Sequence, residues 1–450
     1  MNLSELRSHL DTLDLTPSRK LGQSFLVDEN ISRWIVSQLR VETNDCIVEV
    51  GSGFGALTEH LAGKCRRLIL IEKDGRLAGF LEEKFGHLGV EVVHGDATEY
   101  DVRPLFLEGA VKLIGNLPYS CGNEILRRFL DEPSPVRSAI VMVQKEVADR
   151  FVAQPRSKDY GVLGLMLQRA WRPSVLKTIG TEPFFPRPAV DSTIVRFDSR
   201  SEDELPLHSP EVFERVVKLG FSRRRKQLQN NLGSECENPD QLIRDLGLKA
   251  TVRSEELSLI DWVNLSNSFE THPCAGLPPS DSENLDAVDE MDRVVATLPR
   301  REIHETGRLH RAVHVFLTNR RGDEIYLQKR SHLKDSHPGK WDSSASGHVD
   351  PGESYRDCAI RELWEEVWVK PKGEITRVAR LEASEATDLE FVEVFVAEAK
   401  GNIRVHGKEV ISGRYFSIEL IERWIEIRPE DFATGFRTCF EAWRRNAQET

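Results

Sequence analysis

The sequence lacks features that would place the protein in a membrane or outside the cell. No apolar run approaches the roughly 20 residues of a membrane-spanning helix, and residues 1–20 carry acids without the apolar core of a signal peptide. The 7 cysteines are scattered and form no C-x-x-C pair, which argues against a disulfide framework or a zinc site. We therefore expect a cytoplasmic chain with reduced thiols and no membrane partner.

The composition is that of a globular chain with more than one domain. At 450 residues, with 39% hydrophobic and 30% charged residues, the chain is too long for one ordinary core. The net charge of −12 speaks against a nucleic-acid partner, but bases outnumber acids between residues 127 and 228. Such a local excess can contact a phosphate backbone, although a solvated surface explains the same pattern.

Short apolar runs alternate with amphipathic stretches in the first part of the chain. The runs predict buried parallel strands, at 46–50, 67–72, 90–95 and 111–116, separated by helices at 56–64 and 75–86. Two further strands are expected, at 139–147 and 192–197. Residues 205–268 are predominantly helical in pattern, with helical stretches at 210–232, 239–248 and 254–269. This βαβ repetition predicts an α/β fold with a Rossmann-like, doubly wound sheet and a small helical appendage.

Small and acidic residues close three neighbouring strands of this predicted sheet. The first strand is followed by three glycines that let the backbone approach a ligand closely, Gly51, Gly53 and Gly55. Glu72 ends the next strand, where an acid meets ribose hydroxyls in nucleoside-binding sheets, and Asp96 follows the third. The G-x-G-x-G turn, preceded by Glu49, resembles that of methyltransferases that use S-adenosylmethionine, although the turn by itself does not exclude NAD.

The fourth strand runs into Asn-Leu-Pro-Tyr, residues 116–119. The exocyclic N6 of adenine is a poor nucleophile, so an enzyme that methylates it must hold the amine toward the methyl group. The Asn116 side-chain oxygen and the Leu117 carbonyl can each accept one N–H, because Pro118 restricts the following turn. Tyr119 offers a stacking face for a base removed from its stack. We therefore interpret Asn116, Leu117, Pro118 and Tyr119 as catalytic residues.

Residues 18–268 resemble the KsgA-type ribosomal RNA adenine N6-dimethyltransferase family. The resemblance rests on "KLGQSFLVDENI", "VEVGSGFGALTEHL", "IGNLPYS", "VQKEVADRF", "YGVLGLMLQ", "FFPRPAVDSTIVRF", "FSRRRKQLQNNL" and "RSEELSL". It implies S-adenosylmethionine as cofactor, with contacts at Gln23, Leu26, Gly51, Glu72, Asp96 and Asn116. The candidate cofactor set is completed by Ser24, Glu49, Gly53, Gly55, Lys73 and Ala97. The resemblance also implies that Phe184 helps to sandwich the target adenine.

The family resemblance implies dimethylation of two adjacent adenines in a hairpin loop of small-subunit ribosomal RNA. The partner would be this RNA or the small ribosomal subunit. Four consecutive bases of the helical appendage are the expected phosphate contacts, Arg223, Arg224, Arg225 and Lys226. The sequence departs from the family at Ser24, where Asn is usual, which puts one cofactor contact in doubt. Ser52 stands where the family commonly has Pro, and serine is also a small residue that suits a turn.

A second constellation lies on one predicted helix, residues 354–367. Glu362, Glu365 and Glu366 share one face, and three neighbouring carboxylates repel one another unless a divalent cation binds between them. Oxygen ligands suit Mg²⁺ or Mn²⁺. We expect Arg361 to pair with Glu353 and so to tie the preceding loop to the helix.

Residues 347–369 match the Nudix box, Gly-x5-Glu-x7-Arg-Glu-U-x-Glu-Glu-x-Gly-U with U aliphatic, at every defined position except one. Gly347 is expected to give the tight entry to the loop, whereas Trp368 replaces the final glycine. This glycine normally allows the turn that ends the helix, so we expect a following loop of another shape. The box implies attack of metal-activated water on a small-molecule diphosphate, with Glu365 as a catalytic residue. The candidate phosphate contacts are Lys329, Arg330 and Lys340, although the residue type alone favours a surface charge for each of them.

The second resemblance covers about residues 284–440, and within Nudix proteins it is closest to the isopentenyl-diphosphate-isomerase-like branch. The residue pattern predicts strands at 311–319, 324–331, 389–399 and 414–418 around the helix at 354–367. The resemblance implies that they form an α+β domain. True isomerases carry a cysteine where Ser346 stands, and Ser346 lacks the acidity of a thiol. We therefore favour a hydrolase.

We predict four segments: a methyltransferase domain at 1–204, a helical RNA-binding appendage at 205–269, a linker at 270–283 and a Nudix domain at 284–450. Two alternatives remain open. The first half could methylate an adenine in another nucleic acid, or the chain could be a ribosome-assembly factor that binds precursor RNA and carries an inert Nudix module.

Overall fold

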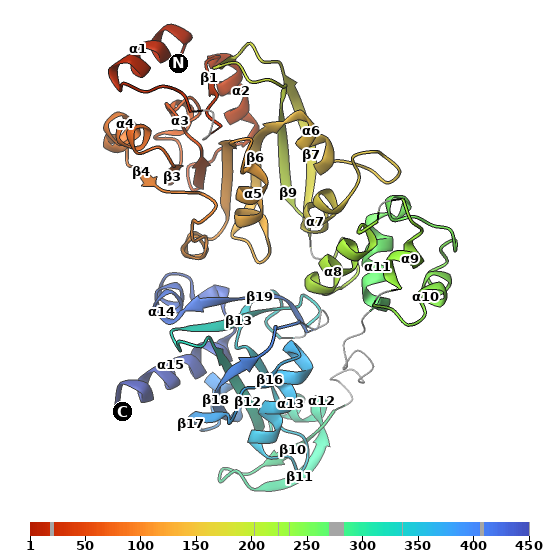
Figure 1. Cartoon of the computed structure of the whole chain (residues 1–450). Helices are drawn as coiled ribbons and strands as arrows, with labels where there is room; N and C mark the ends of the chain where they lie inside the picture. The colour runs from red at the N-terminus through yellow and green to blue at the C-terminus, as the bar shows by residue number, and fades with distance from the viewer. Residues whose placement is uncertain are drawn as a thin grey trace. The chain divides into compact units, whose positions relative to one another are not determined.

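The computed structural model describes residues 1–18, 22–201, 203–223, 225–233, 235–269, 283–334, 336–405 and 409–449. They form two compact units, which are described separately here (Figure 1). The first comprises residues 1–205, 217–240 and 247–261, and the second comprises 206–216, 241–246 and 262–450. Among the described residues, no helix is long and apolar enough to cross a membrane.

The first unit is built on a seven-stranded sheet in the order β4-β3-β2-β5-β6-β9-β7. Its parallel strands are β2 (Cys46–Val50), β3 (Arg67–Glu72), β4 (Val90–His94), β5 (Val111–Asn116) and β6 (Val136–Gln144). Strands β9 (Ser192–Ser199) and β7 (Trp171–Ile179) add to it antiparallel. The doubly wound fold is thereby confirmed, with one correction: the apolar run at 139–147 leaves the strand at Gln144, and Lys145 begins a helix.

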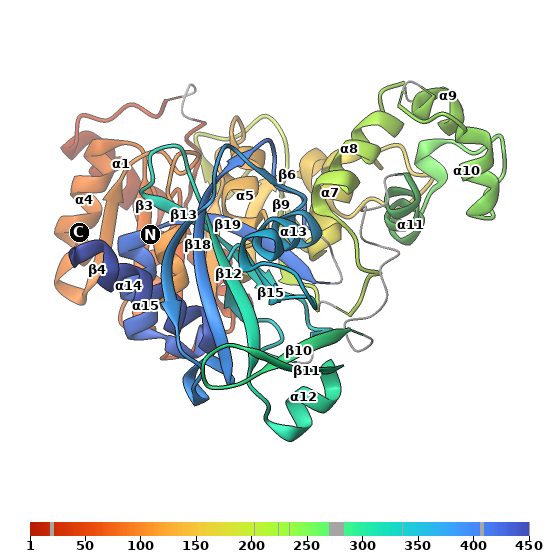
Figure 2. The same ribbon diagram turned by 90° about the horizontal axis from the view of Figure 1, so that it is seen from below.

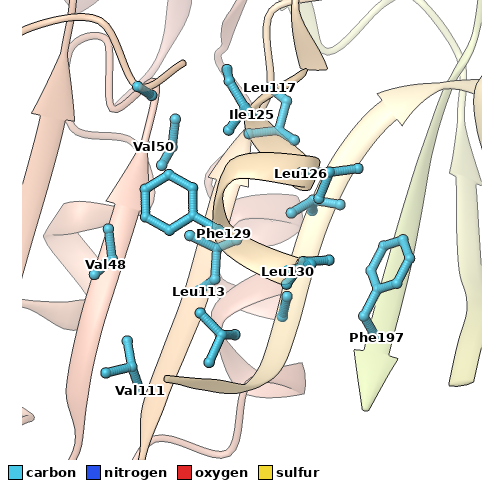
Figure 3. Packing of buried hydrophobic residues seen from close by; sticks show 14 of the residues in the cluster. Val48, Val50, Val111, Leu113, Leu117, Ile125, Leu126, Phe129, Leu130 and Phe197 are labelled. Atoms are coloured by element: carbon cyan, nitrogen blue, oxygen red, sulfur yellow. The ribbon is translucent and has the colours of Figure 1, made fainter. Parts of the chain in front are cut away.

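Helices cover both faces of this sheet, because alternate strand residues point to opposite sides. Val48, Leu113 and their neighbours pack against α5 (Gly122–Leu130), α6 (Lys145–Phe151) and α7 (Val162–Ala170) (Figure 3). On the other face, Ile47 and Ile114 pack against α2 (Glu29–Gln38), α3 (Thr58–Leu61) and α4 (Gly75–Phe85). Two apolar layers therefore hold the strand ends of this sheet in fixed positions.

The amino-terminal elements were not predicted from the sequence. Helix α1 (Leu3–Thr12) begins with a capping box, in which Asn2 and Glu5 bond each other's backbone N–H groups. Its Leu6 and Leu10 pack with Phe54, which belongs to the glycine-rich turn. The short strand β1 (Phe25–Leu26) pairs with β8 (Phe184–Phe185), which brings two distant segments together.

The helical segment consists of α8 (Pro210–Gly220), α9 (Leu228–Leu232), α10 (Pro239–Asp245) and α11 (Leu259–Phe269). The continuous helix expected at 210–232 is interrupted after Gly220. The amide of Asn231 donates to the carbonyls of Gly220 and Arg223, which supplies partners that helix continuation would otherwise provide. The two compact units divide this segment between them, so its boundary with the flanking domains stays a prediction.

The second unit contains an eight-stranded mixed sheet. Strand β12 (His310–Thr318) lies parallel to β18 (Glu390–Lys400), and β13 (Glu324–Arg330) pairs with β14 (Trp341–Asp342) and β19 (Val410–Ser417). Strands β15 (Ala345–His348), β16 (Lys370–Pro371) and β17 (Thr376–Leu381) complete it. The helix α13 (Tyr355–Val367) lies against this sheet (Figure 2). Its Cys358, Ala359 and Leu363 are buried in the core between helix and sheet.

Other elements of this unit had not been expected. A hairpin of β10 (Asn284–Val288) and β11 (Val294–Pro299) precedes the short helix α12 (Arg300–Thr306). Helices α14 (Ile418–Ile427) and α15 (Thr434–Glu449) end the chain. Aromatic residues of these two helices, such as Trp424 and Phe436, are buried, which explains why this segment folds onto the sheet.

Candidate functional site

A pocket that is open to solvent lies at the carboxyl ends of β2, β3, β4 and β5. Parallel strands bring their carboxyl ends to one edge of a sheet, which is where ligands bind in such folds. Most of the residues predicted for the first site line this pocket: Gln23, Ser24, Gly51, Gly53, Glu72, Lys73, Asp96, Ala97, Asn116, Leu117, Pro118 and Tyr119.

The glycine-rich turn needs its glycines for steric reasons. Gly51 has a φ of +71°, and a Cβ there would lie 2.9 Å from the carbonyl oxygen of Asn116. The N–H of Gly53 donates to Glu72 Oε2 at 2.9 Å, and the N–H of Asp74 donates to Glu72 Oε1 at 3.0 Å. Burial raises the pKa of Glu72. The carboxylate thus shapes the turn and can still accept hydrogen bonds from hydroxyl groups in the pocket.

Asp96 is held by its neighbours at the end of β4. Its Oδ1 accepts from the backbone N–H and the hydroxyl of Thr98, at 3.0 and 2.8 Å, and Lys73 pairs with its Oδ2. The ion pair with Lys73, followed by the Thr98 N–H, lowers the pKa of Asp96 to about 2. Asp96 is therefore an ionised hydrogen-bond acceptor at neutral pH.

The orientation of Asn116 follows from one hydrogen bond. Its Nδ2 donates to the carbonyl oxygen of Ser24 at 3.0 Å, so the side-chain oxygen is left to accept from a ligand. The Ser24 hydroxyl donates to the carbonyl of Pro186 at 2.9 Å. The turn itself is closed by the N–H of Gly122, which donates to the carbonyl of Pro118 at 2.8 Å. The segment around Ser24, the segment around Pro186 and the turn after β5 thus lie together at the Asn116 side chain.

Four predicted site residues do not line the pocket: Leu26, Glu49, Gly55 and Phe184. Leu26 and Phe184 pair across β1 and β8 and are buried in the sheet's core. Glu49 is buried and accepts from the Thr58 hydroxyl at 2.9 Å. A Cβ on Gly55 would lie 2.5 Å from the ring of Phe85. In this structure these residues support the pocket from behind instead of forming its wall.

The predicted RNA contacts lie in the turn between α8 and α9. Arg223, Arg225 and Lys226 are exposed, while Arg224 lies outside the described residues. Their exposure is compatible with phosphate contacts, which stay a prediction.

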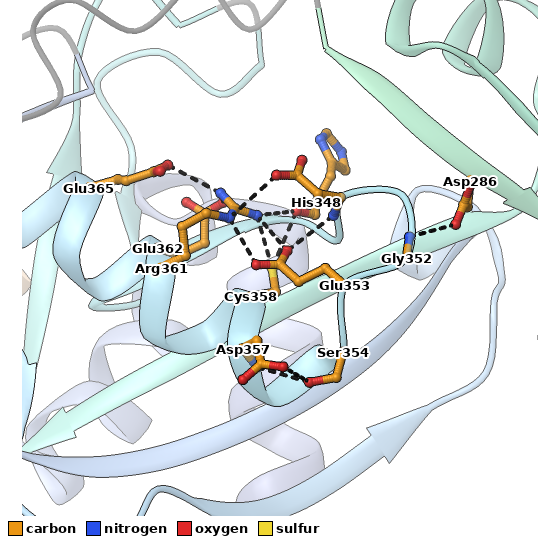
Figure 4. Close-up of polar contacts among 11 residues, drawn as sticks. Asp286, His348, Gly352, Glu353, Ser354, Asp357, Cys358, Arg361, Glu362 and Glu365 are labelled. Atoms are coloured by element: carbon orange, nitrogen blue, oxygen red, sulfur yellow. Dashed lines mark hydrogen bonds and ion pairs between the residues drawn. The ribbon is translucent and has the colours of Figure 1, made fainter.

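In the second unit, Arg361 of α13 organises the loop before the helix. It donates to both oxygens of Glu353, at 3.1 and 3.0 Å, which confirms the expected pair (Figure 4). The same guanidinium donates to the carbonyl of His348 at 2.9 Å, to Glu362 at 2.7 Å and to Glu365 at 3.1 Å. One cation therefore faces three of the acidic side chains.

Glu362 and Glu366 are buried beside β15. Only glycine fits at position 347, because a Cβ there would lie 2.1 Å from a carboxylate oxygen of Glu362. Gly347 belongs to strand β15 and does not make the tight loop entry that we expected. Glu366 Oε2 accepts from the Ser346 N–H and from Gln328, both at 3.0 Å. Burial, and then the neighbouring acids, raise the pKa of Glu362, and burial raises that of Glu366.

The ligand oxygens of the three helix glutamates are not gathered within 4.8 Å of one another among the described residues. Glu365 is turned toward Arg361, and Lys334 lies 3.7 Å from Glu366 Oε1 while also pairing with Glu409. A metal held by this face would therefore displace at least one of these cations.

The expectation of a differently shaped loop after the helix was wrong. Trp368 takes the left-handed conformation, with φ +49° and ψ +42°, that the usual glycine would take. The N–H of Val369 donates to the carbonyl of Leu363 at 3.0 Å, as in an ordinary helix ending. The Trp368 ring lies edge-on to Trp364 and under Arg404, which compensates part of the backbone strain.

The three candidate phosphate contacts do not form one group. Arg330 is buried and donates to Asp342 at 2.7 Å, and Lys340 bonds the carbonyl of Glu430. Lys329 lies on β13 opposite Trp341. Arg330 is thus a structural cation here.

A histidine cluster was missed in the sequence. His304 of α12, His310 of β12 and His348 of β15 have ring nitrogens within 4.8 Å of one another. Glu390 Oε1 lies 3.2 Å from Nε2 of His348 and 3.3 Å from Nε2 of His310.

The protonation of this cluster suits metal binding. Partial burial and the other two imidazoles lower the pKa of His304 to about 4, and burial lowers that of His348. Burial alone would raise the pKa of Glu390, but the two histidines hold it below its usual range. Neutral imidazoles with one carboxylate are a donor set for a divalent transition metal. The only sequence signal was the number of histidines near the box, without a recognisable spacing.

Comparison with known proteins agrees with this architecture. Residues 16–271 match the family described as ribosomal RNA adenine dimethylase, and residues 308–434 match the NUDIX domain. The ribosomal RNA small subunit methyltransferase A of Syntrophus aciditrophicus (strain SB) is 36% identical over 274 residues, which is 59% of this chain and 96% of the relative. The protein of the same name from Alkaliphilus oremlandii (strain OhILAs) is 36% identical over 262 residues, 56% and 91% of the two chains.

Among solved structures, the 23S rRNA methyltransferase ErmE is 26% identical, with a TM-score of 0.45, and covers 54% of this chain and 99% of its own. The family model spans more than half of this chain, whereas the isomerase-like branch of the second domain stays a prediction. The chain therefore belongs to the ribosomal RNA adenine dimethylase family and carries a NUDIX hydrolase domain in its second half.

Proposed function

We propose that the first unit transfers methyl groups from S-adenosylmethionine to the N6 atoms of two adjacent adenines in small-subunit ribosomal RNA. The observation that carries this proposal is the Asn116 amide, whose nitrogen is occupied by Ser24 and whose oxygen is left to accept an amine N–H. The names of the relatives support small-subunit ribosomal RNA as the substrate. The exposed Arg223, Arg225 and Lys226 support contact with its phosphates.

The pocket residues fit the proposed cofactor. Gly51 and Gly53 have positive φ values and lie too close to the Asn116 carbonyl and the Phe25 ring to carry a Cβ, so the tight turn beside the pocket needs glycine. Glu72 and Asp96 offer acceptors for hydroxyl and amino groups. When bound, S-adenosylmethionine supplies an electrophilic methyl group on a sulfonium. We assign the contacts with it to the two glycines, to the two acids and to Gln23, Lys73 and Ala97 of the pocket wall.

The protein's share of the chemistry is positioning. The Asn116 side-chain oxygen and the Leu117 carbonyl accept the two amine N–H bonds, which directs the N6 lone pair toward the methyl carbon. Methyl transfer to N6 would break the carbon–sulfur bond, leave the cofactor as a neutral thioether and place positive charge on N6. The Asn116 and Leu117 oxygens would stabilise that charge until a proton leaves to solvent. Tyr119 stacks on the base. No side chain of the pocket has to act as a strong base.

Methylation of small ribosomal subunits that lack the modification tests this proposal. Labelled S-adenosylmethionine, followed by mass spectrometry of the digested RNA, should show dimethyladenosine at two neighbouring positions. Small subunits that already carry the modification serve as the control, and duplex and single-stranded DNA test the rival acceptor. Label in DNA alone would support the rival, and no label in any acceptor would support a binding factor.

We further propose that the second unit hydrolyses a small-molecule diphosphate with the help of divalent metal. The Nudix helix offers Glu362, Glu365 and Glu366 for Mg²⁺ or Mn²⁺, and the histidine cluster with Glu390 offers a second site for a transition metal. A bound metal would supply an activated water and neutralise phosphate charge. The protein's own contribution is to hold these carboxylates through Arg361 and Gln328. We place both activities in the cytoplasm.

A panel of nucleoside and isoprenoid diphosphates, assayed for released phosphate with and without Mg²⁺ or Mn²⁺, tests the second activity. Wild-type turnover that disappears in Glu365→Gln is the expected result. The exposed Glu302 of α12 lies outside the box, so Glu302→Gln is the matched control. Silence of the wild type across the panel would favour the inert module.

A further inference from the structure

The hydroxyl group of Tyr119 binds to a residue of the central sheet. This hydroxyl lies 2.6 Å from Oγ of Ser192. Ser192 begins β9, where it pairs with Gln144 of β6 on one side and with Ile179 of β7 on the other. The exposed fraction of Ser192 is 0%. The ring is thus held both by its own backbone, in the turn after β5, and by a hydroxyl that two neighbouring strands keep in place.

Among the described residues, no other aromatic ring and no cation packs on the Tyr119 ring, in contrast to Tyr100, which stacks on Phe129 at 5.8 Å. Tyr119 lines the pocket beside Asn116. Burial raises the pKa of its phenol, so the hydroxyl stays neutral and keeps the hydrogen bond at physiological pH.

We propose that Ser192 is a positioning residue for methyl transfer, because its hydroxyl holds the Tyr119 ring in the orientation on which the target base stacks. This inference rests on the proposed adenine methylation. Without the hydrogen bond the ring can rotate about both side-chain torsions, and the base is presented to the methyl group for a smaller fraction of the time. Ser192 does not line the pocket and does not touch the base itself.

The adjacent residue provides a matched control. Thr193 has an exposed fraction of 1%, lies in the same strand, and its hydroxyl is 3.1 Å from that of Thr178. Successive side chains of a strand point to opposite faces, so Thr193 faces away from Ser192's side of the sheet. Thr193→Val removes a buried hydroxyl of β9 without affecting Tyr119.

A double-mutant cycle on the full chain tests the inference. Ser192→Ala, Tyr119→Phe and the double variant are compared with wild type for kcat and KM on unmethylated small subunits, for S-adenosylmethionine affinity by calorimetry, and for Tm. We expect kcat to fall roughly tenfold in each single variant and no further in the double variant, because both remove the same bond. The cofactor Kd should change less than about twofold, since neither Ser192 nor Tyr119 is among the residues assigned to the cofactor.

Comparing Tm among the variants distinguishes a role of Ser192 in positioning Tyr119 from a role in stabilising the fold. Tyr119→Phe leaves the buried Ser192 hydroxyl without this partner, so it should lower Tm more than the double variant does. Thr193→Val should lower Tm as Ser192→Ala does, because each removes a buried hydroxyl, but it should keep kcat. Unchanged kcat in Ser192→Ala, multiplicative losses in the double variant, or an equal loss in Thr193→Val would each overturn the inference. Absence of methyl transfer by wild type would instead refute the proposed function.

Discussion

Replacement of Asn116 by alanine is the sharpest test of how the first site works. The change removes the donor to the Ser24 carbonyl, a partly buried hydrogen bond of 3.0 Å, whose loss costs about 1 kcal/mol of stability. It also removes the oxygen that would accept an amine N–H. Loss of one preorganised group at a reacting centre typically lowers kcat by about 10² to 10³, equivalent to about 2.7–4 kcal/mol.

The two effects are separated by measuring them independently. Single-turnover transfer of labelled methyl to unmethylated small subunits reports the chemical step, and calorimetry reports the cofactor Kd. We expect the rate to fall at least about a hundredfold, with only a small change in Kd, because the other pocket residues stay in place. Asn44 is exposed and precedes β2, at the opposite end of the sheet, so Asn44→Ala is the matched control.

Asn116→Asp distinguishes orientation from mere presence of an oxygen. The carboxylate keeps an acceptor but sets an oxygen without a proton against the Ser24 carbonyl, so the side chain must turn away. We expect its rate to lie between those of wild type and Asn116→Ala. Near-normal transfer by Asn116→Ala, or a loss explained wholly by weaker cofactor binding, would refute the assigned role.

Three other predictions follow from the packing. Gly51→Ala forces a side chain into a φ of +71° and against the Asn116 carbonyl at 2.9 Å, so calorimetry should show S-adenosylmethionine affinity reduced at least about tenfold; unchanged affinity would place the cofactor elsewhere. Burial raises the pKa of Glu49 from 4.5 to about 7, so the folded chain retains a proton that the unfolded chain releases, and wild-type stability falls as pH rises through this window. Glu49→Gln should therefore exceed wild type in stability by at most roughly 3 kcal/mol above pH 7, with the advantage shrinking toward pH 4.5 in denaturant titrations, and a pH-independent difference would contradict this. His304→Asn should abolish a rise of Tm on adding Zn²⁺, whereas the exposed His87 of the first unit, changed to Asn, should leave it intact; equal rises in both variants would exclude the histidine cluster as the site.

The first sheet and its pocket were accessible from sequence because their signals are local. A buried parallel strand reads as an apolar run, and a ligand-binding turn reads as glycines followed by acids at the next strand ends. Asn116, Glu72 and Asp96 therefore line the pocket as the sequence indicated. The Nudix helix was accessible for the same reason, since spacing along one helix decides which glutamates share a face.

Whether a predicted site residue faces the pocket or the protein core was harder to predict from sequence. Glu49 and Phe184 were predicted as site residues, yet both are buried behind the pocket. Trp368 shows the converse: its residue type argued for a different loop, but the surrounding structure holds it in the left-handed conformation. Tertiary packing outweighed a backbone preference of about 1–2 kcal/mol.

The amino-acid sequence alone determined which functional groups follow one another along the chain. These are the glycine-rich turn, the two acids at the next strand ends, the Asn-Leu-Pro-Tyr turn and the helix with three glutamates. Only the tertiary structure decided which distant groups complete these sites. The Ser24 carbonyl that orients Asn116 and the histidines that gather around Glu390 come from separate segments. Periodicity and steric freedom are properties of neighbouring residues, whereas the direction of a side chain and its partner depend on how whole elements pack.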